Sequence, residues 1–168
     1  MGDSKALTRW ARALRPLAAA LVLAVTFGCV QMQLKMREPG ERNTGFPDEV
    51  ADEYHCAKRP LPFFEVEEDE LLPERLTPGA EFNHRLQYVL CPVEETQVVS
   101  GTLHTRILYK GKPIHAESST RDLQPGRWVV DAFITLPADA KPGVYALQSE
   151  FKSKHGKFDS RSTFLVED

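Results

Sequence analysis

The last third of the chain is the sequence feature that most limits what the protein can fold into. Residues 136–168 begin with a loop rich in Pro, Asp and Ala and continue as two runs in which apolar and polar residues alternate. A short turn at Lys154-His155-Gly156 separates the two runs. This pattern is typical of a β-hairpin that closes an antiparallel sheet. We therefore expect the preceding residues to supply partner strands for this hairpin.

Upstream segments also have the pattern of strands. Residues 82–90 alternate with period two, which places on one face Phe82, His84, Leu86, Tyr88 and Leu90. Residues 113–120 are more polar and suit a sheet edge. The remaining strands are expected at 63–66, 98–109, 128–136, 145–151 and 158–166. These segments predict an all-β fold, a seven-stranded antiparallel immunoglobulin-like sandwich, with a closed barrel as the alternative.

The loop before the final hairpin resembles a known corner motif. Residues 136–147 read LPADAKPGVYAL and look like the E–F corner of bacterial immunoglobulin-like and fibronectin-type domains. The resemblance implies that Tyr145 is the tyrosine of this corner, whose hydroxyl bonds to the backbone a few residues upstream. Leu147 stands where an antibody domain has a cysteine. The resemblance covers residues 63–168 at the level of fold and implies no activity.

The first 28 residues have the pattern of an export signal. Arg9, Arg12 and Arg15 precede an uncharged apolar run over residues 17–28. A positive segment followed by a short apolar core is typical of a secretory signal. We therefore expect the body of the protein to lie outside the cytoplasm.

The end of this signal resembles the lipobox of bacterial lipoproteins. Gly28 directly precedes Cys29, although Thr26 stands where a lipobox usually carries Leu. The resemblance implies that Cys29 carries a lipid such as palmitate and becomes the mature N-terminus. An uncleaved membrane anchor over residues 17–34 is an alternative, and ordinary signal cleavage is another.

Residues 29–60 show no sustained period and mix charges with Gly and Pro. We interpret them as a flexible tether, which makes residues 61–168 the sandwich domain. Cys56 lies near the end of the tether, and Cys91 ends the first long strand. An exported location makes a disulfide between these two cysteines the default expectation.

The charge distribution excludes one class of partner. The chain has a net charge of −3, with four cations and one anion in the first 28 residues, so the remainder carries −6. An acidic body does not suit nucleic-acid binding, which needs a basic face. The acidic run over residues 65–70 lacks the spacing of a calcium loop. We expect it to face cations of the final hairpin, namely Lys152, Lys154, Lys157 and Arg161.

Motifs that carry chemistry are sparse. The sequence contains no phosphate-binding glycine loop, no G-x-S-x-G elbow, no H-E-x-x-H and no C-x-x-C. His104 and His115 flank the turn at residues 110–112. Two residues that pair across a turn centred on Gly111 have numbers that sum to 222, and the numbers of these two histidines sum to 219. They form a weak candidate metal pair without an evident third ligand. We expect no cofactor.

These observations favour a non-catalytic, membrane-tethered module of the bacterial cell envelope, facing the periplasm or attached to the outer membrane where the cell has two membranes. Its expected role is that of a protein-binding or accessory subunit with an envelope protein as partner. A carbohydrate- or adhesion-type binder is the alternative. It requires exposed rings, for which the candidates are Tyr54, Tyr88, Tyr109 and Trp128. An enzyme built on His104 and His115 is a third class.

Overall fold

The computed structural model describes residues 37–168, and every element named below lies within the compact unit Glu38–Asp168. The helical elements are α2 (Pro47–Glu53) and a short 3-10 helix, η1 (Cys56–Lys58). The strands are β1 (Gly40–Gly45), β2 (Phe63–Leu72), β3 (Arg75–Leu76), β4 (Glu81–Cys91), β5 (Val99–Tyr109), β6 (Lys112–Leu123), β7 (Gly126–Thr135), β8 (Gly143–Ser153) and β9 (Gly156–Val166).

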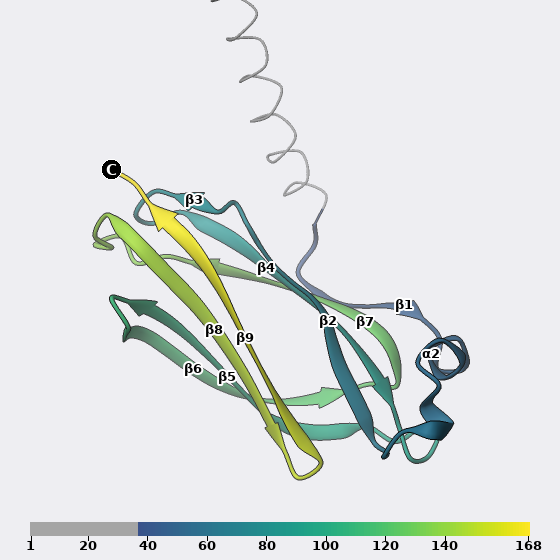
Figure 1. The fold of residues 1–168 in the computed structure, drawn as a ribbon. Coiled ribbons are helices and arrows are strands. Elements are labelled where there is room, and N and C mark those ends of the chain that lie inside the picture. Colours follow the sequence, from purple (N-terminus) through teal and green to yellow (C-terminus); the bar gives the residue numbers. More distant parts are fainter. Residues whose placement is uncertain (1–36) are drawn as a thin grey trace, which may run out of the picture. The chain divides into compact units, whose positions relative to one another are not determined.

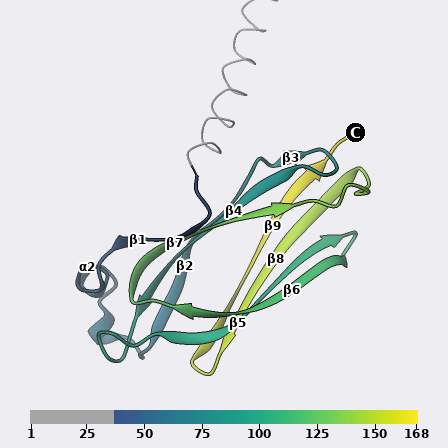
Figure 2. The ribbon, with the colours of Figure 1, turned by 180° about the vertical axis from the view of Figure 1, so that it is seen from behind.

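The strands form two sheets that pack face to face (Figures 1 and 2). The four-stranded sheet has the order β1-β7-β4-β2, and the five-stranded sheet has the order β3-β9-β8-β5-β6. The prediction of an all-β sandwich is confirmed. Two details differ from the predicted seven-stranded antiparallel sandwich. The described residues form nine strands, and β3 pairs in parallel with β9.

Period-two alternation builds the core between the sheets. One group of buried residues lies around Phe82, Tyr145 and Phe164, whose rings are stacked or tilted against one another. A second group lies around Tyr88, Leu90 and Phe151. Burial of a large apolar side chain stabilises the fold by about 1.5–3 kcal/mol. These two groups therefore hold the sheets together.

Aromatic packing closes the sandwich on the side of β2 and β9. Phe64 of β2 lies edge-to-face against Phe151, with a centroid distance of 6.0 Å, and against Phe158, at 6.2 Å. Edge-to-face geometry is favourable because the positive ring edge meets the negative ring face. This contact fixes the first long strand against the final hairpin.

Tyr145 has the position that the corner resemblance implies. Its hydroxyl donates a hydrogen bond to the carbonyl oxygen of Lys141 at 2.7 Å, and its ring is almost fully buried. Tyr109 stacks on the same ring at a centroid distance of 4.7 Å. The corner therefore anchors the start of β8 to the core.

The prediction of a flexible tether up to residue 60 is wrong for residues 40–58. β1 pairs antiparallel with β7, and α2 and η1 follow it directly. The chain passes so close to Gly126, at φ +97°, that a Cβ there would lie 2.6 Å from the carbonyl oxygen of Gly45. β1 escaped the sequence analysis because five of its six residues are exposed, so it shows no apolar alternation.

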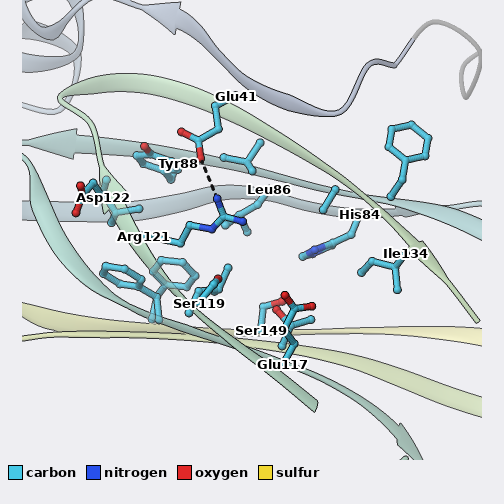
Figure 3. A pocket seen from close by; sticks show the side chains of 18 residues that line it. Glu41, His84, Leu86, Tyr88, Glu117, Ser119, Arg121, Asp122, Ile134 and Ser149 are labelled. Atoms are coloured by element: carbon cyan, nitrogen blue, oxygen red, sulfur yellow. Dashed lines mark ion pairs between the residues drawn. The ribbon is translucent and has the colours of Figure 1, made fainter. Parts of the chain in front are cut away.

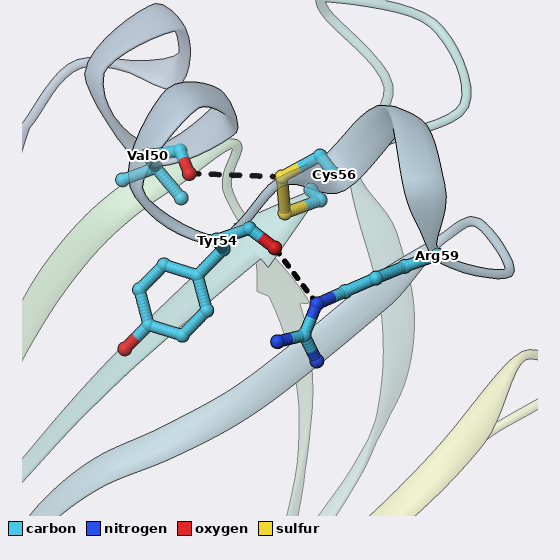
Figure 4. Close-up of a disulfide and its surroundings, with 5 residues drawn as sticks. Val50, Tyr54, Cys56 and Arg59 are labelled. Atoms are coloured by element: carbon cyan, nitrogen blue, oxygen red, sulfur yellow. Dashed lines mark hydrogen bonds between the residues drawn. A yellow bond between two sulfur atoms is a disulfide. The ribbon is translucent and has the colours of Figure 1, made fainter.

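The disulfide between Cys56 and Cys91 is confirmed, with a Cα–Cα distance of 5.8 Å (Figure 4). It belongs to a third apolar group with Val50 of α2 and Val89 of β4. α2 begins with Pro47 at its first turn, and the backbone N–H of residue 46 donates to the carboxylate of Glu49 at 2.9 Å. The disulfide and this helix cover one end of the outer face of the four-stranded sheet.

Removal of this disulfide tests its contribution to stability. The bond closes a loop with a sequence separation of 35, for which the chain-entropy model gives about 3–4 kcal/mol. We expect the double variant Cys56→Ala with Cys91→Ala to lose about this much unfolding free energy in urea titrations. An unchanged midpoint, relative to the oxidised wild type, would contradict the pairing.

Candidate functional site

A cleft of about 190 Å³ lies between the two sheets and opens on the side away from the β2–β9 contact (Figure 3). We call it the inter-sheet cleft. β4 and β7 supply an apolar wall with Leu86, Tyr88, Val130, Ala132 and Ile134. β6 supplies a polar wall with Glu117, Ser119 and Arg121. His84, Ser149 and Phe151 lie deeper inside.

The polar wall follows from the register of β6. Glu117 lies opposite Thr105, Ser119 opposite Leu103, and Arg121 opposite Gly101. Directly opposed residues of antiparallel strands point to the same face of the sheet. β6 therefore presents charged and hydroxyl groups where its neighbour β5 presents the core side. Closing this wall onto the apolar wall would bury charges without partners, which is costly.

A single loose ion pair crosses the mouth of the cleft. Arg121 Nη1 of β6 lies 3.8 Å from Glu41 Oε1 of β1, and the two side chains are 52% and 36% exposed. This distance exceeds that of a hydrogen bond. Exposed pairs of this kind contribute about 0–1 kcal/mol. The pair is therefore easily exchanged for other partners.

A histidine–carboxylate pair lies between the cleft and the closed side of the sandwich. His84 Nε2 lies 2.7 Å from Asp69 Oδ1. Burial alone would raise the pKa of Asp69, but the hydrogen bond with His84 and the nearby hydroxyl groups of β9 outweigh burial and lower it. The Asp69 carboxylate is thus held in its charged form inside the sandwich.

This pair has the first element of acid–base chemistry but no reacting partner. A carboxylate that accepts from Nε2–H leaves Nδ1 of a neutral imidazole as an acceptor. Within residues 37–168, however, Asp69 is the only side chain that makes a hydrogen bond to His84. The pair orients the ring at the inner end of the cleft, which Ser149 also lines, and within residues 37–168 no hydrogen bond joins Ser149 to His84.

Asp131 of β7 lies on the outer face of the four-stranded sheet, where its side-chain contacts hold β7 against β4 and β1. Its side chain has no solvent exposure and accepts two hydrogen bonds of 2.9 Å from Arg85 of β4. Arg42 of β1 lies 3.0 Å away, and Asn83 donates at 3.1 Å. Burial raises the pKa of Asp131, but the hydrogen bonds from Arg85 and Asn83 outweigh it, so the pKa is lowered. This network fixes the strand that carries Ala132 of the apolar wall.

A second network ties α2 to the sheet through Glu67. Arg127 of β7 donates to both Glu67 oxygens at 2.8–3.0 Å and to Glu53 of α2 at 2.8 Å. Tyr54 donates to Glu67 at 2.6 Å, and burial together with this bond raises the pKa of Tyr54 to about 12. Glu67 thus takes its partners from Tyr54, Gln87 and Arg127, and Asp69 pairs with His84. Neither carboxylate is paired with one of the four cations expected in the final hairpin.

The two histidines proposed as a metal pair are not brought together. His104 lies opposite Ser118 and forms a 2.7 Å hydrogen bond to its hydroxyl, whereas His115 lies opposite Ile107. In the observed register the residue numbers of an opposed pair sum to 222, so His104 lies opposite residue 118. His115 is three positions from residue 118, and an odd offset places the two histidines on opposite faces of the sheet. The prediction of this pair is wrong. Within residues 37–168 no three His, Cys, Asp or Glu side chains are grouped to hold a metal ion.

Cys29, the predicted lipidation site, lies outside the described residues. From residue 37 onward, the structure contains no helix that is long and apolar enough to span a bilayer. The inter-sheet cleft was not anticipated from the sequence. The available signal was that residues 117–122 read ESSTRD, which is polar at the positions of both faces.

Comparisons with known proteins give only distant likenesses. No protein-family model matches the chain, and no curated protein matches it. Among solved structures, the sporulation control protein Spo0M from Bacillus subtilis is similar with a TM-score of 0.45 and 17% identity, over 62% of this chain and 49% of that chain. A Paenibacillus sp. cycloisomaltooligosaccharide glucanotransferase gives 0.46 and 19%, over 61% and 14%. A Listeria innocua β-glucosidase gives 0.46 and 13%, over 66% and 17%. The chain spans less than half the length of each of these proteins.

The Asp131 network predicts a specific response to acid. Because the folded-state pKa of Asp131 is lowered, its contribution is fully present above its ordinary pKa near 3.8 and is lost as the pH falls through the folded value. We expect Asp131→Asn to cost about 3 kcal/mol at pH 7, since two arginines lose their charged partner. Below about pH 4 the difference from wild type should shrink.

Urea unfolding measured from pH 7 to pH 3 checks this, with Asp159→Asn on the exposed face of β9 as control. Parallel pH profiles for wild type and Asp131→Asn would contradict the assignment.

Proposed function

We propose that the chain is a non-catalytic protein-binding module, tethered at a membrane on its extracytoplasmic side, that accepts an extended segment of a partner protein at the open side of its sandwich. The observation that carries this proposal is the position of the inter-sheet cleft. It lies beside β6, a 12-residue strand at the edge of the five-stranded sheet.

An edge strand offers a row of backbone groups to a partner. Within residues 37–168, β6 pairs with β5 on one side only, so the backbone N–H and C=O groups on its other side are available to an added strand. In strand addition, main-chain hydrogen bonds supply affinity and pockets for alternate side chains supply specificity. β6 and the inter-sheet cleft provide both parts next to each other.

The location outside the cytoplasm rests on two supports. The disulfide between Cys56 and Cys91 suits an oxidising compartment. The arginine-flanked apolar run over residues 17–28 has the pattern of a secretory signal. We propose lipidation at Cys29 as the anchor in a bacterial envelope, with an uncleaved helix or ordinary cleavage as the alternatives.

The non-catalytic character is part of this proposal. Within residues 37–168, His84 is hydrogen-bonded to Asp69, and His104 lies apart from His115. The carbohydrate alternative gains no support from the candidate rings. Tyr88 is buried, Tyr54 belongs to the Glu67 network, and Tyr109 stacks on Tyr145. Trp128 packs against the core group around Tyr88, and its indole N–H donates to the carbonyl oxygen of Pro125.

Site-specific photo-crosslinking in the membrane-anchored chain tests this function. Ile114 of β6 and Val144 of β8 are both exposed, at 44% and 65%, and lie on the same sheet. We expect a photoreactive residue at position 114 to form an adduct with a partner protein in intact cells. The same residue at position 144 should give at least about tenfold less adduct.

Filling the cleft provides the second arm of this experiment. Ala132 is exposed on the apolar wall, so Ala132→Trp should abolish the adduct at position 114, while Thr135→Trp near the end of the same strand should leave it. Equal adduct at positions 114 and 144, or an adduct unaffected by Ala132→Trp, would contradict binding at this edge.

A further inference from the structure

The inward side of β6 carries an ordered pattern of charge. Glu117 is negative, Ser119 is small and polar, and Arg121 is positive, and all three line the inter-sheet cleft (Figure 3). Within the described residues Glu117 forms no ion pair, and Arg121 has only the loose contact with Glu41. Both charges are therefore available to a segment that pairs with β6.

The free edge is regular where these charges lie. Pro113 and the register shift between Ile107 and Leu108 fall at the end of β6 next to its turn. From residue 115 to residue 123 the ladder with β5 has no bulge. A proline and a bulge are two of the features that block an edge against strand addition, and inward-pointing charges, which this edge carries, are a third that acts against strands without matching charges. The edge beside the cleft has neither a proline nor a bulge.

The cleft has the size of one apolar group. Its volume of about 190 Å³ compares with about 150 Å³ for an engineered apolar cavity that binds benzene. Leu86, Val130 and Ile134 form its apolar wall. Ser119 lies between the two charges, and its small side chain leaves space for a larger side chain from the opposing strand.

We propose that the partner segment is an antiparallel strand with the pattern acidic-x-apolar-x-basic, read from its N-terminus. This inference rests on the proposed function and names the chemistry of its partner. The acidic residue lies opposite Arg121, the apolar residue opposite Ser119 with its side chain in the cleft, and the basic residue opposite Glu117. The x positions point away from the cleft, because side chains alternate along a strand.

The energetics favour this arrangement over its reverse. Opposite charges on directly opposed strand residues are attractive, whereas like charges are destabilising. Antiparallel pairs are more common than parallel pairs and somewhat more stable. Exchange of Glu41 for an acidic residue of the partner costs little, because the Arg121–Glu41 contact is long and exposed.

The chain itself contains part of this pattern. Residues 117–121 read ESSTR. If two copies paired antiparallel through β6 with Ser119 opposite Ser119, Glu117 of each copy would lie opposite Arg121 of the other. That segment has no apolar residue for the cleft. A foreign segment therefore fits the site better than a second copy, and self-association is one outcome of the test.

Peptide binding to the full-length chain in detergent micelles tests the pattern. The probes are fluorescein-labelled TETLTKT, the charge-reversed TKTLTET, and TETSTKT, which lacks the apolar side chain. We expect TETLTKT to bind at least about tenfold more tightly than either control by fluorescence polarisation. Equal affinity for TETLTKT and TETSTKT would overturn insertion into the cleft. Equal affinity for TETLTKT and TKTLTET, or a preference for the latter, would overturn the charge order.

A variant with reversed peptide preference distinguishes loss of recognition from loss of folding, because an unfolded protein binds neither peptide. The double variant Glu117→Arg with Arg121→Glu exchanges the two charges in place, and it should prefer TKTLTET by a similar factor. A swapped protein that still prefers TETLTKT would overturn the roles of these two residues.

Light scattering on the same samples detects a second copy as the occupant. A wild-type dimer that is lost in Glu117→Arg and restored in the double variant would overturn the foreign segment. The crosslinking experiment distinguishes failure of the proposed sequence pattern from failure of the proposed binding edge. Adducts at position 114 without peptide discrimination would reject the pattern and leave strand addition standing, whereas absence of adducts would reject the binding edge itself.

Discussion

The structure depends on a difference between the two sides of its sandwich. On one side, Phe64 packs edge-to-face against Phe151 and Phe158, and the strands β2 and β9 lie in contact. On the other side, the contact across the cleft mouth is the 3.8 Å pair between Arg121 and Glu41. Aromatic pairs add about 0.5–1.5 kcal/mol beyond area burial, whereas an exposed ion pair adds little. The core is therefore sealed along one side and accessible along the other.

Sequence alone predicted the parts of this fold that depend on apolar alternation. The seven expected strands correspond to β2 and to β4 through β9. The Cys56–Cys91 bond and the Tyr145 corner are also present. β1 was missed for a physical reason, because the segment GERNTG joins the sheet through its backbone and through Arg42, which contacts Asp131. A strand that buries almost no side chain leaves no periodic signal.

The site was harder to predict because it depends on register. His104 and His115 were weak candidates for a pair across the turn, but a shift of three positions sets them on opposite faces of the sheet. A shift by any odd number of residues has this effect, since side chains alternate with period two. The cleft likewise arises from which polar residues of β6 point inward. The sequence shows that residues 117–122 are polar but does not give the partners that decide their orientation.

The inward charges of β6 connect stability with recognition. Inward-pointing charges are one of the means by which proteins prevent edge strands from pairing indiscriminately. A single charge would only repel, but Glu117 and Arg121 have opposite signs and lie on either side of Ser119. In the strand addition proposed above, such an arrangement would reject strands with the wrong charge order and accept strands with the matching order, so specificity would arise from repulsion as well as attraction. The polar wall that leaves this sandwich unsealed is then also the wall that selects the proposed partner strand.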